Sequence, residues 1–254
     1  MEKMRKPFQG VVNIVCFNWH FYVLSLCFIL VLMTSANYFR EQIQIYIYIV
    51  CGLVTSNLLI SLFVSYYVYD LSGFYKLSWL NDLRLEEESR MVNVNAGFDE
   101  TSNLLRQKFP SSTLTVFDFY DPAKHTEISI KRARKAYPPF LGSRQISTQS
   151  LPLKDKSVDA IFLIFAAHEI RNENERIVFF KELNRAIKPT GQIIMTEHIR
   201  DVANFLAYNI GTFHFYPRSG WQRVFRSAEL RIVKEIKLTP FVSTFVLAHN
   251  GDSL

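Results

Sequence analysis

The chain has 254 residues, of which 49% are hydrophobic, and it carries 29 Lys and Arg against 23 Asp and Glu. This length accommodates one mid-sized domain and an additional segment. The resulting net charge of +6 comes from scattered residues, which suits a membrane surface and does not favour nucleic-acid binding.

Two long apolar stretches occupy the first quarter of the chain. Residues 7–39 and 42–69 contain no Asp, Glu, Lys or Arg, and each stretch exceeds the roughly 20 residues that cross a hydrocarbon core. We therefore predict a membrane anchor over residues 1–70, with transmembrane helices at about 11–34 and 43–69. The alternative is a buried helical pair in a soluble core. A cleaved signal peptide is disfavoured because a second apolar stretch follows at once.

Basic residues set the expected topology of this anchor. Those that precede the first stretch are Lys3, Arg5 and Lys6. The turn between the stretches offers only Arg40, beside Glu41, and basic flanks favour the cytoplasmic side, so the amino terminus is expected in the cytoplasm. Two crossings return the chain to that side. Residues 71–90 are expected to connect this anchor to a cytoplasmic domain at 91–254, and the charged segment RLEEESR, at residues 84–90, is expected to be exposed and helical.

From residue 90 onward, short apolar runs alternate with helix-like segments, which predicts an α/β domain with a mostly parallel sheet covered on both faces. Strands are expected at residues 90–94, 112–120, 143–149, 157–166 and 192–198. Helices are expected at residues 101–109, 127–137 and 172–187. The last helix has Asn172 as its expected cap and ends at KPTG, where Pro189 and Gly191 interrupt it. A closing antiparallel pair is expected at residues 230–238 and 243–250.

Two stretches within this series carry a family resemblance. They are LPLKDKSVDAIFLIFAAHEI, at residues 151–170, and FFKELNRAIKPTGQIIMTEH, at residues 179–198. In order and spacing they resemble the fourth-strand and fifth-strand motifs of the class I S-adenosylmethionine-dependent methyltransferases, over roughly residues 90–250. The resemblance implies a methyltransferase, class EC 2.1.1, with a Rossmann-like, mostly parallel seven-stranded sheet and S-adenosyl-L-methionine as its cofactor.

The stretch MVNVNAGFDETSNLL corresponds to the first strand of this family and its glycine-rich turn. In the family an acid ends the strand and a GxGxG turn follows, whereas here the acid position is Asn93 and the glycine positions are Asn95, Gly97 and Asp99. Asn tolerates a left-handed backbone better than other non-glycine residues, so Asn95 is expected to preserve the turn. Asp99 or Glu100 would accept from the cofactor's α-ammonium group or stabilise the helix terminus. We therefore expect a working site with an altered loop.

Further cofactor contacts are implied after the later strands. Asp118 matches the acid that binds both ribose hydroxyls in the family, with Asp121 as its rival and a turn cap as the structural alternative. Gln149, with Thr148 as second choice, would face the adenine. The full set of cofactor-binding residues implied by the resemblance is Asn93, Asn95, Ala96, Gly97, Asp99, Glu100, Asp118, Gln149 and Ala166.

Titratable side chains follow the fourth and fifth strands. His168 and Glu169 come after the fourth strand, and Glu197 and His198 end the fifth. These side chains should meet, because ligands of open parallel sheets bind beyond the carboxyl ends of the strands. Histidine titrates near neutral pH, so we expect His168 or His198 to be the catalytic base, oriented by Glu169 or Glu197. Two structural histidines are the alternative. A metal is not expected, because no pair of ligands has a distinctive spacing.

An aromatic-rich section lies between the fifth strand and the closing pair. Its expected acceptor-binding residues are Tyr208, His214, Tyr216 and Trp221. Such a group can line a site for an apolar acceptor, rest on the bilayer surface, or form ordinary helix core. The basic run KRARK, at residues 131–135, is interpreted as a solvated helix face, and no nucleic-acid partner is expected.

The sequence therefore favours a membrane-anchored methyltransferase that acts on a lipophilic small molecule: an aromatic pigment precursor, a quinone precursor or a lipid. The membrane bilayer and this acceptor are the expected partners. A catalytically inactive membrane scaffold is the alternative, because Asn93 and Asn95 replace family residues. A nicotinamide-dependent reductase is disfavoured because no GxGxxG follows the first strand.

Overall fold

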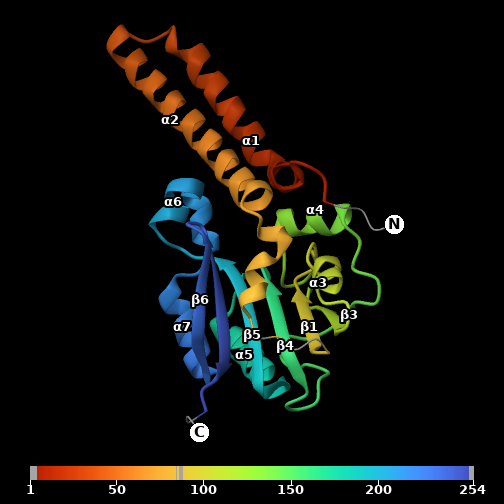
Figure 1. Ribbon diagram of the computed structural model, residues 1–254. Coiled ribbons are helices and arrows are strands. Elements are labelled where there is room, and N and C mark those ends of the chain that lie inside the picture. The colour runs from red at the N-terminus through yellow and green to blue at the C-terminus, as the bar shows by residue number, and fades with distance from the viewer. Residues whose placement is uncertain (1–4, 84, 86–87, 252–254) are drawn as a thin grey trace.

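The computed structural model describes residues 5–83, 85 and 88–251. A seven-stranded sheet in the order β3-β2-β1-β4-β5-β7-β6 forms the centre of the domain (Figure 1). β1 to β5 are parallel to one another, whereas β7 is antiparallel to both β5 and β6. The strands are β1 (Arg90–Asn95), β2 (Thr113–Asp118), β3 (Arg144–Gln145), β4 (Val158–Ile164), β5 (Ile187–His198), β6 (Leu230–Thr239) and β7 (Val242–His249). The predicted parallel sheet with a closing antiparallel pair is confirmed.

Apolar residues on alternate positions of the strands pack against two different layers. In β4, Ile161 and Leu163 face the helices α5 (Glu173–Ala186) and α7 (Arg218–Ser227). Phe162 faces the opposite layer, which contains the helix α3 (Ser102–Lys108) and residues 74–83. Neighbouring strand residues point to opposite faces of the sheet, so each layer covers the apolar side chains of one face and shields them from water.

The helix α5 begins where the sequence predicts and ends slightly early. Asn172 caps it by accepting a hydrogen bond from the main-chain N–H of Glu175 at 3.0 Å. β5 then starts at Ile187, five residues before the predicted residue 192. Ile187 pairs with Val158, and a register shift follows before the regular pairing with β4 resumes. The strand therefore includes the KPTG segment, at which the helix was expected to end.

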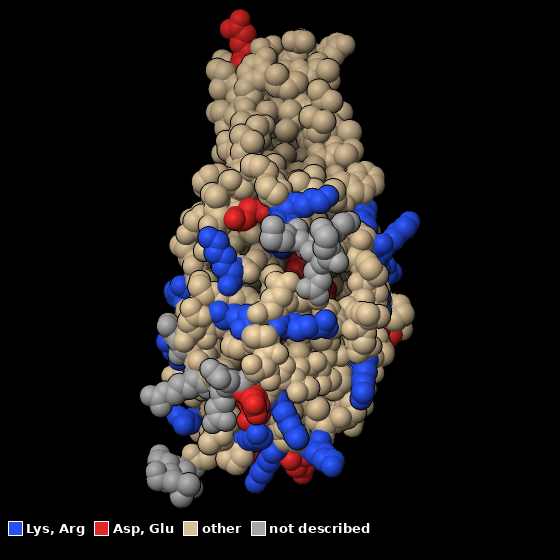
Figure 2. All heavy atoms as spheres, turned by 45° about the vertical axis from the view of Figure 1, so that its right-hand side comes forward, with Lys and Arg blue, Asp and Glu red and all other residues tan. Residues whose placement is uncertain are grey.

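Two long helices, α1 (Gln9–Ala36) and α2 (Glu41–Tyr66), form a hairpin that projects from the domain (Figure 1). They are long and apolar enough to cross a membrane. Only 6% of the most apolar stretch of the first span and 11% of that of the second are buried. Figure 2 shows a face of this hairpin that is free of basic side chains along most of its length. A core helix of a soluble domain would instead bury most of these side chains.

Polar contacts join the two ends of the hairpin at its base. The Asp70 carboxylate accepts hydrogen bonds from the main-chain N–H groups of Gly10 and Val11, at 2.8 and 2.9 Å. A side chain at Gly10 would not fit, because its Cβ would lie 2.4 Å from the Cβ of Tyr69. Glycine thus permits α1 to approach the segment that continues α2.

The segment after α2 packs on the sheet. A π-helical turn (Tyr67–Leu71) and two 3-10 turns (Phe74–Lys76 and Ser78–Asp82) follow. Phe74 and Leu80 are buried in the core, so this part is not an exposed connector. Of the RLEEESR segment, Arg84, Glu86 and Glu87 lie outside the described residues; Leu85, Glu88 and Ser89 are not helical.

Candidate functional site

The turn after β1 is built around Gly97. Gly97 has a φ of +92°, and its main-chain N–H donates to the side-chain oxygen of Asn95 at 3.0 Å. Asn95 has no positive φ, so it holds the turn through its side chain and not through a left-handed backbone. Asp99 caps the start of α3, because one carboxylate oxygen accepts from the N–H groups of Thr101 and Ser102, each at 2.9 Å.

Two buried acceptors near this turn have no partner among the described residues. They are the side-chain oxygen of Asn93 and the second carboxylate oxygen of Asp99. The Asn93 amide nitrogen donates to the hydroxyls of Thr101 and Ser102, at 3.1 and 2.8 Å, which fixes its oxygen in place. An unpaired buried acceptor is costly, so the pair is suited to a ligand that brings N–H donors.

Asp118 ends β2 as the sequence predicts, and it already has two partners. One oxygen accepts from the main-chain N–H of Tyr120 at 2.8 Å, and the other forms an ion pair with Arg134 at 2.5 Å. Arg134 belongs to α4 (Ile128–Ala136) and also lies over Gly97, where an added Cβ would approach its guanidinium to 2.9 Å. Arg134 therefore competes with a ligand for one oxygen of this carboxylate and for the space over Gly97.

A cavity of about 520 Å³ adjoins this ion pair at the ends of β2 and β3. Tyr120, Arg134 and Thr148 are among its lining residues, whereas Gln149 is exposed and lies outside it. Thr148, the second choice for the adenine contact, donates to Glu175 at 2.5 Å. Ala96 and Ala166, also implied as cofactor contacts, are buried in the core beside the strand ends.

Glu100 faces the hairpin. Its carboxylate accepts hydrogen bonds from Arg5 at 2.8 Å, Gln9 at 3.0 Å, Asn13 at 3.2 Å and the Tyr75 hydroxyl at 2.8 Å. All of its described partners come from the start of α1, the segment before it and the segment after α2. The structure therefore assigns Glu100 to the junction between hairpin and domain, and Asp99 remains the acid beside the turn.

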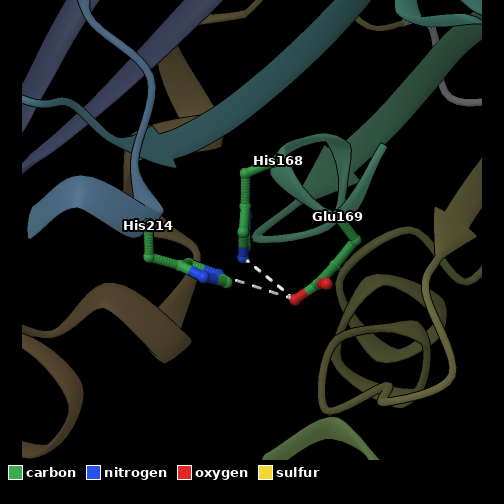
Figure 3. Close-up of side chains that lie close together, drawn as sticks. All are labelled: His168, Glu169 and His214. Atoms are coloured by element: carbon green, nitrogen blue, oxygen red, sulfur yellow. Dashed lines mark ion pairs between the residues drawn. The ribbon is translucent and has the colours of Figure 1, made fainter. Parts of the chain in front are cut away.

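Three side chains converge beyond the ends of β4 and β5 (Figure 3). His168 and Glu169 lie in a 3-10 turn (Ala167–Glu169), and His214 ends a second one (Asn209–His214). His168 contacts Glu169 through Nε2 at 3.3 Å and Glu197 through Nδ1 at 2.7 Å. Burial alone would lower the pKa of His168, but Glu197 and Glu169 outweigh it and raise that pKa to about 10.

His198 occupies a separate, enclosed position. Its Nδ1 lies 2.9 Å from the main-chain oxygen of Phe241, so Nδ1 carries the proton, and Nε2 accepts from the Tyr69 hydroxyl at 2.8 Å. Burial lowers the pKa of His198 to about 4, which keeps the ring neutral at pH 7. Neither expected base therefore has a free basic nitrogen: that of His198 is bound to Tyr69, and both nitrogens of His168 face carboxylates.

The expected acceptor-binding residues divide into two groups. Tyr208 lies edge-on to the His198 ring at 5.6 Å, and His214 joins His168 and Glu169. Tyr216 and Trp221 lie instead against the guanidinium of Arg176, at 3.7 and 5.7 Å, and Trp221 is 1% exposed within the core. Helix core, one of the alternatives for this section, accounts for Trp221.

Several residues at this site were not expected from the sequence. They are Tyr69, Glu127, Arg134 and Arg171. Arg171 donates to Glu127 at 2.5 Å and to the main-chain oxygen of His214 at 2.7 Å. No local pattern marks these side chains, because each acts through partners far away in the sequence.

Comparison with known proteins agrees with the geometry. Residues 92–195 match the family described as a methyltransferase domain. A ubiquinone/menaquinone biosynthesis C-methyltransferase, UbiE, from Syntrophotalea carbinolica is 25% identical over 154 residues, which are 58% of this chain and 60% of that protein. The chain thus spans less than two thirds of this relative's length.

Solved structures share the fold at low identity. A SAM-dependent methyltransferase from Aquifex aeolicus has a TM-score of 0.50 and 16% identity, and the match covers 71% of this chain and 94% of that one. The PH0226 protein from Pyrococcus horikoshii OT3 has a TM-score of 0.50 and 14% identity, with 67% and 85% covered. The chain therefore carries a methyltransferase domain of class I, the S-adenosylmethionine-dependent class. S-adenosylmethionine is the cofactor that this class implies.

The residues at the strand ends fit this cofactor. The unpaired oxygens of Asn93 and Asp99 suit the α-ammonium group, and the Asp118 carboxylate suits the ribose hydroxyls once Arg134 has moved. The cavity beside Tyr120 and Thr148 lies on the side that the adenine would occupy. S-adenosylmethionine, when bound, supplies an activated methyl group.

Proposed function

We propose that this protein transfers a methyl group from S-adenosylmethionine to a lipophilic small molecule at a membrane surface. The proposal rests on the position of the carboxyl ends of β4 and β5, which face the base of the hairpin. His198, at the end of β5, is bonded to Tyr69 of the segment that continues α2, and Phe165 after β4 packs against the same Tyr69 ring. An acceptor dissolved in the bilayer would therefore enter beside the base of the hairpin.

The class of acceptor follows from this position and from the UbiE relative. That relative is named for C-methylation in ubiquinone and menaquinone biosynthesis. An aromatic pigment precursor, a quinone precursor or a lipid would partition into the membrane, which raises its local concentration near the anchored domain. Aromatic side chains around His198, including Tyr208 and Phe215, supply apolar contacts for such a molecule.

Methyl transfer is tested with the full chain reconstituted in lipid vesicles. Lipid extracts from cells that lack the gene are incubated with protein and isotopically labelled S-adenosylmethionine, and the products are analysed by mass spectrometry. We expect one labelled lipid-soluble product, absent with Asp118→Ala. If the folded protein neither binds S-adenosylmethionine nor labels any product, it is a scaffold that retains the methyltransferase fold.

Membrane insertion of the hairpin predicts that Cys27 is protected from alkylation. Cys27 is exposed on α1, so it would react readily if the hairpin stood in water. A thiol in hydrocarbon does not ionise and reacts slowly with a charged maleimide. In a variant with Cys16→Ser and Cys51→Ser, we expect labelling of Cys27 only after detergent is added.

A matched control places a thiol on the domain. Ser111 is exposed in the loop before β2, so Ser111→Cys in a background without the three native cysteines should react with and without detergent. Rapid labelling of Cys27 in intact membranes would contradict insertion. In that case the hairpin projects into water, and the argument for a lipophilic acceptor fails.

A further inference from the structure

We propose that His168, Glu169 and His214 together bind one divalent transition-metal ion. Their ligand atoms all lie within 4.8 Å of one another. Oε1 of Glu169 is 3.3 Å from Nε2 of His168 and 3.8 Å from Nε2 of His214 (Figure 3). Ligand atoms around a tetrahedral ion with bonds of about 2.0–2.1 Å lie roughly 3.4 Å apart, so these three need only small shifts to share an ion.

The outer contacts of both histidines have the form that metal ligands take. Nδ1 of His168 lies 2.7 Å from Glu197, and Nδ1 of His214 lies 3.0 Å from Glu127. A metal-bound histidine almost always donates its other ring N–H to a carboxylate or carbonyl, which fixes the ring and leaves the opposite nitrogen for the ion. Here two histidines from separate segments each have such a carboxylate, and their Nε2 atoms both face Glu169.

The charge of this cluster also calls for a cation. Among the described residues, three carboxylates (Glu127, Glu169 and Glu197) face one guanidinium, that of Arg171, which leaves an excess of negative charge once the ring proton of His168 has left. Uncompensated charge in a partly buried place is unfavourable, and a divalent ion offsets this excess. Arg171 lies close to the His214 ring, with its Nη2 atom 3.1 Å from Nε2, so the guanidinium must turn away from this nitrogen when an ion binds. Its bonds to Glu127 and to the main-chain oxygen of His214 offer it a place beside the site.

Two imidazole nitrogens and one carboxylate oxygen select among metals. This set suits Zn²⁺, Fe²⁺ or Mn²⁺, whereas Mg²⁺ prefers oxygen ligands throughout. Three protein ligands leave at least one coordination position open. An oxygen of the acceptor can take that position, a role that rests on the proposed methyl transfer. The metal site itself does not depend on it.

Metal titration without cofactor or acceptor tests the site directly. The purified full chain is stripped with a chelator, dialysed and titrated with Zn²⁺ by calorimetry and with Co²⁺ by visible absorption. We expect one ion per chain and a Co²⁺ absorption band. His214→Ala should weaken binding by at least about tenfold, since even outer-sphere changes cost that much. His249→Ala is the matched control, because His249 lies on β7 and contacts Ile187, and it should bind as the unaltered chain does.

Two results would overturn the site: no binding by the folded chain, or equal affinity in the unaltered chain and His214→Ala. Glu169→Gln provides a second variant of similar shape, and thermal unfolding establishes that each variant is folded. Methyl transfer is measured separately. If the chain binds metal but transfers no methyl group, the metal site stands and the proposed function is wrong. If the stripped chain binds no metal on titration and still transfers methyl groups at the full rate, the metal site is wrong and the proposed function stands.

Discussion

Asp118→Ala is expected to weaken S-adenosylmethionine binding by roughly 100-fold, because the loss of two hydrogen bonds from ribose hydroxyls to a carboxylate, at about 1.5 kcal/mol each, amounts to about 3 kcal/mol. Asp118 is 3% exposed and stands at the carboxyl end of β2, paired with Arg134, which lines the cavity. Isothermal titration calorimetry of the full chain in detergent measures the dissociation constant. Asp155→Ala is the control, since this exposed carboxylate pairs with Arg185 and does not line the cavity.

Arg134→Ala should act in the opposite direction. Its guanidinium pairs with Asp118 at 2.5 Å and covers Gly97, so the ligand must displace it. Removal of the guanidinium is therefore expected to tighten S-adenosylmethionine binding. Weaker binding in Arg134→Ala would show that the arginine contacts the ligand, and unchanged binding in Asp118→Ala would show that the ribose lies elsewhere.

Glu100→Ala is expected to lower the free energy of unfolding by about 3 kcal/mol, because it leaves the buried Arg5 guanidinium without its partner. The Arg5 and Glu100 side chains are only 18% and 10% exposed. For a chain of this size that loss corresponds to a fall in Tm of roughly 6–12 °C. Thermal unfolding of the reconstituted protein, followed by tryptophan fluorescence, measures it.

The same substitution should loosen the junction at the base of the hairpin. Protease digestion is expected to release the segment around Arg5 sooner in Glu100→Ala than in the unaltered chain, because Gln9 and Asn13 lose the same acceptor. Glu88→Ala is the control, since Glu88 is exposed before β1. Equal Tm values for the two variants would mean that Glu100 contributes nothing to anchoring.

The sheet and the hairpin were predictable from local pattern. Apolar runs bounded by Pro, Gly and Asn predict where strands and helices begin and end. The segment KPTG is a place where this method gave the wrong start of a strand. Proline and glycine there ended α5 as expected, but Ile187 found a partner in Val158 and the strand began early. Pairing with a strand far away in the sequence therefore decided where β5 begins, and local propensity contains no information about such pairing.

The site was predictable at the strand ends only. Asn93, Asp99 and Asp118 stand where the order of motifs placed them, because the carboxyl ends of parallel strands share one edge of a sheet. Glu100 is the next residue after Asp99, yet it faces Arg5 and Tyr75. Adjacent side chains on a turn point in different directions, and only the packed hairpin reveals that Glu100 faces away from the turn.

The sequence by itself determined that this chain has an apolar hairpin and a mostly parallel α/β sheet, because burial imposes periodicities of charge and hydrophobicity that are visible in order along the chain. Only the tertiary structure decided that His214 joins His168 and Glu169, that Arg134 covers Asp118, and that Tyr69 reaches His198. These partners are 16 to 129 residues apart. Their meeting depends on how separate elements pack, and periodicity carries no information about that.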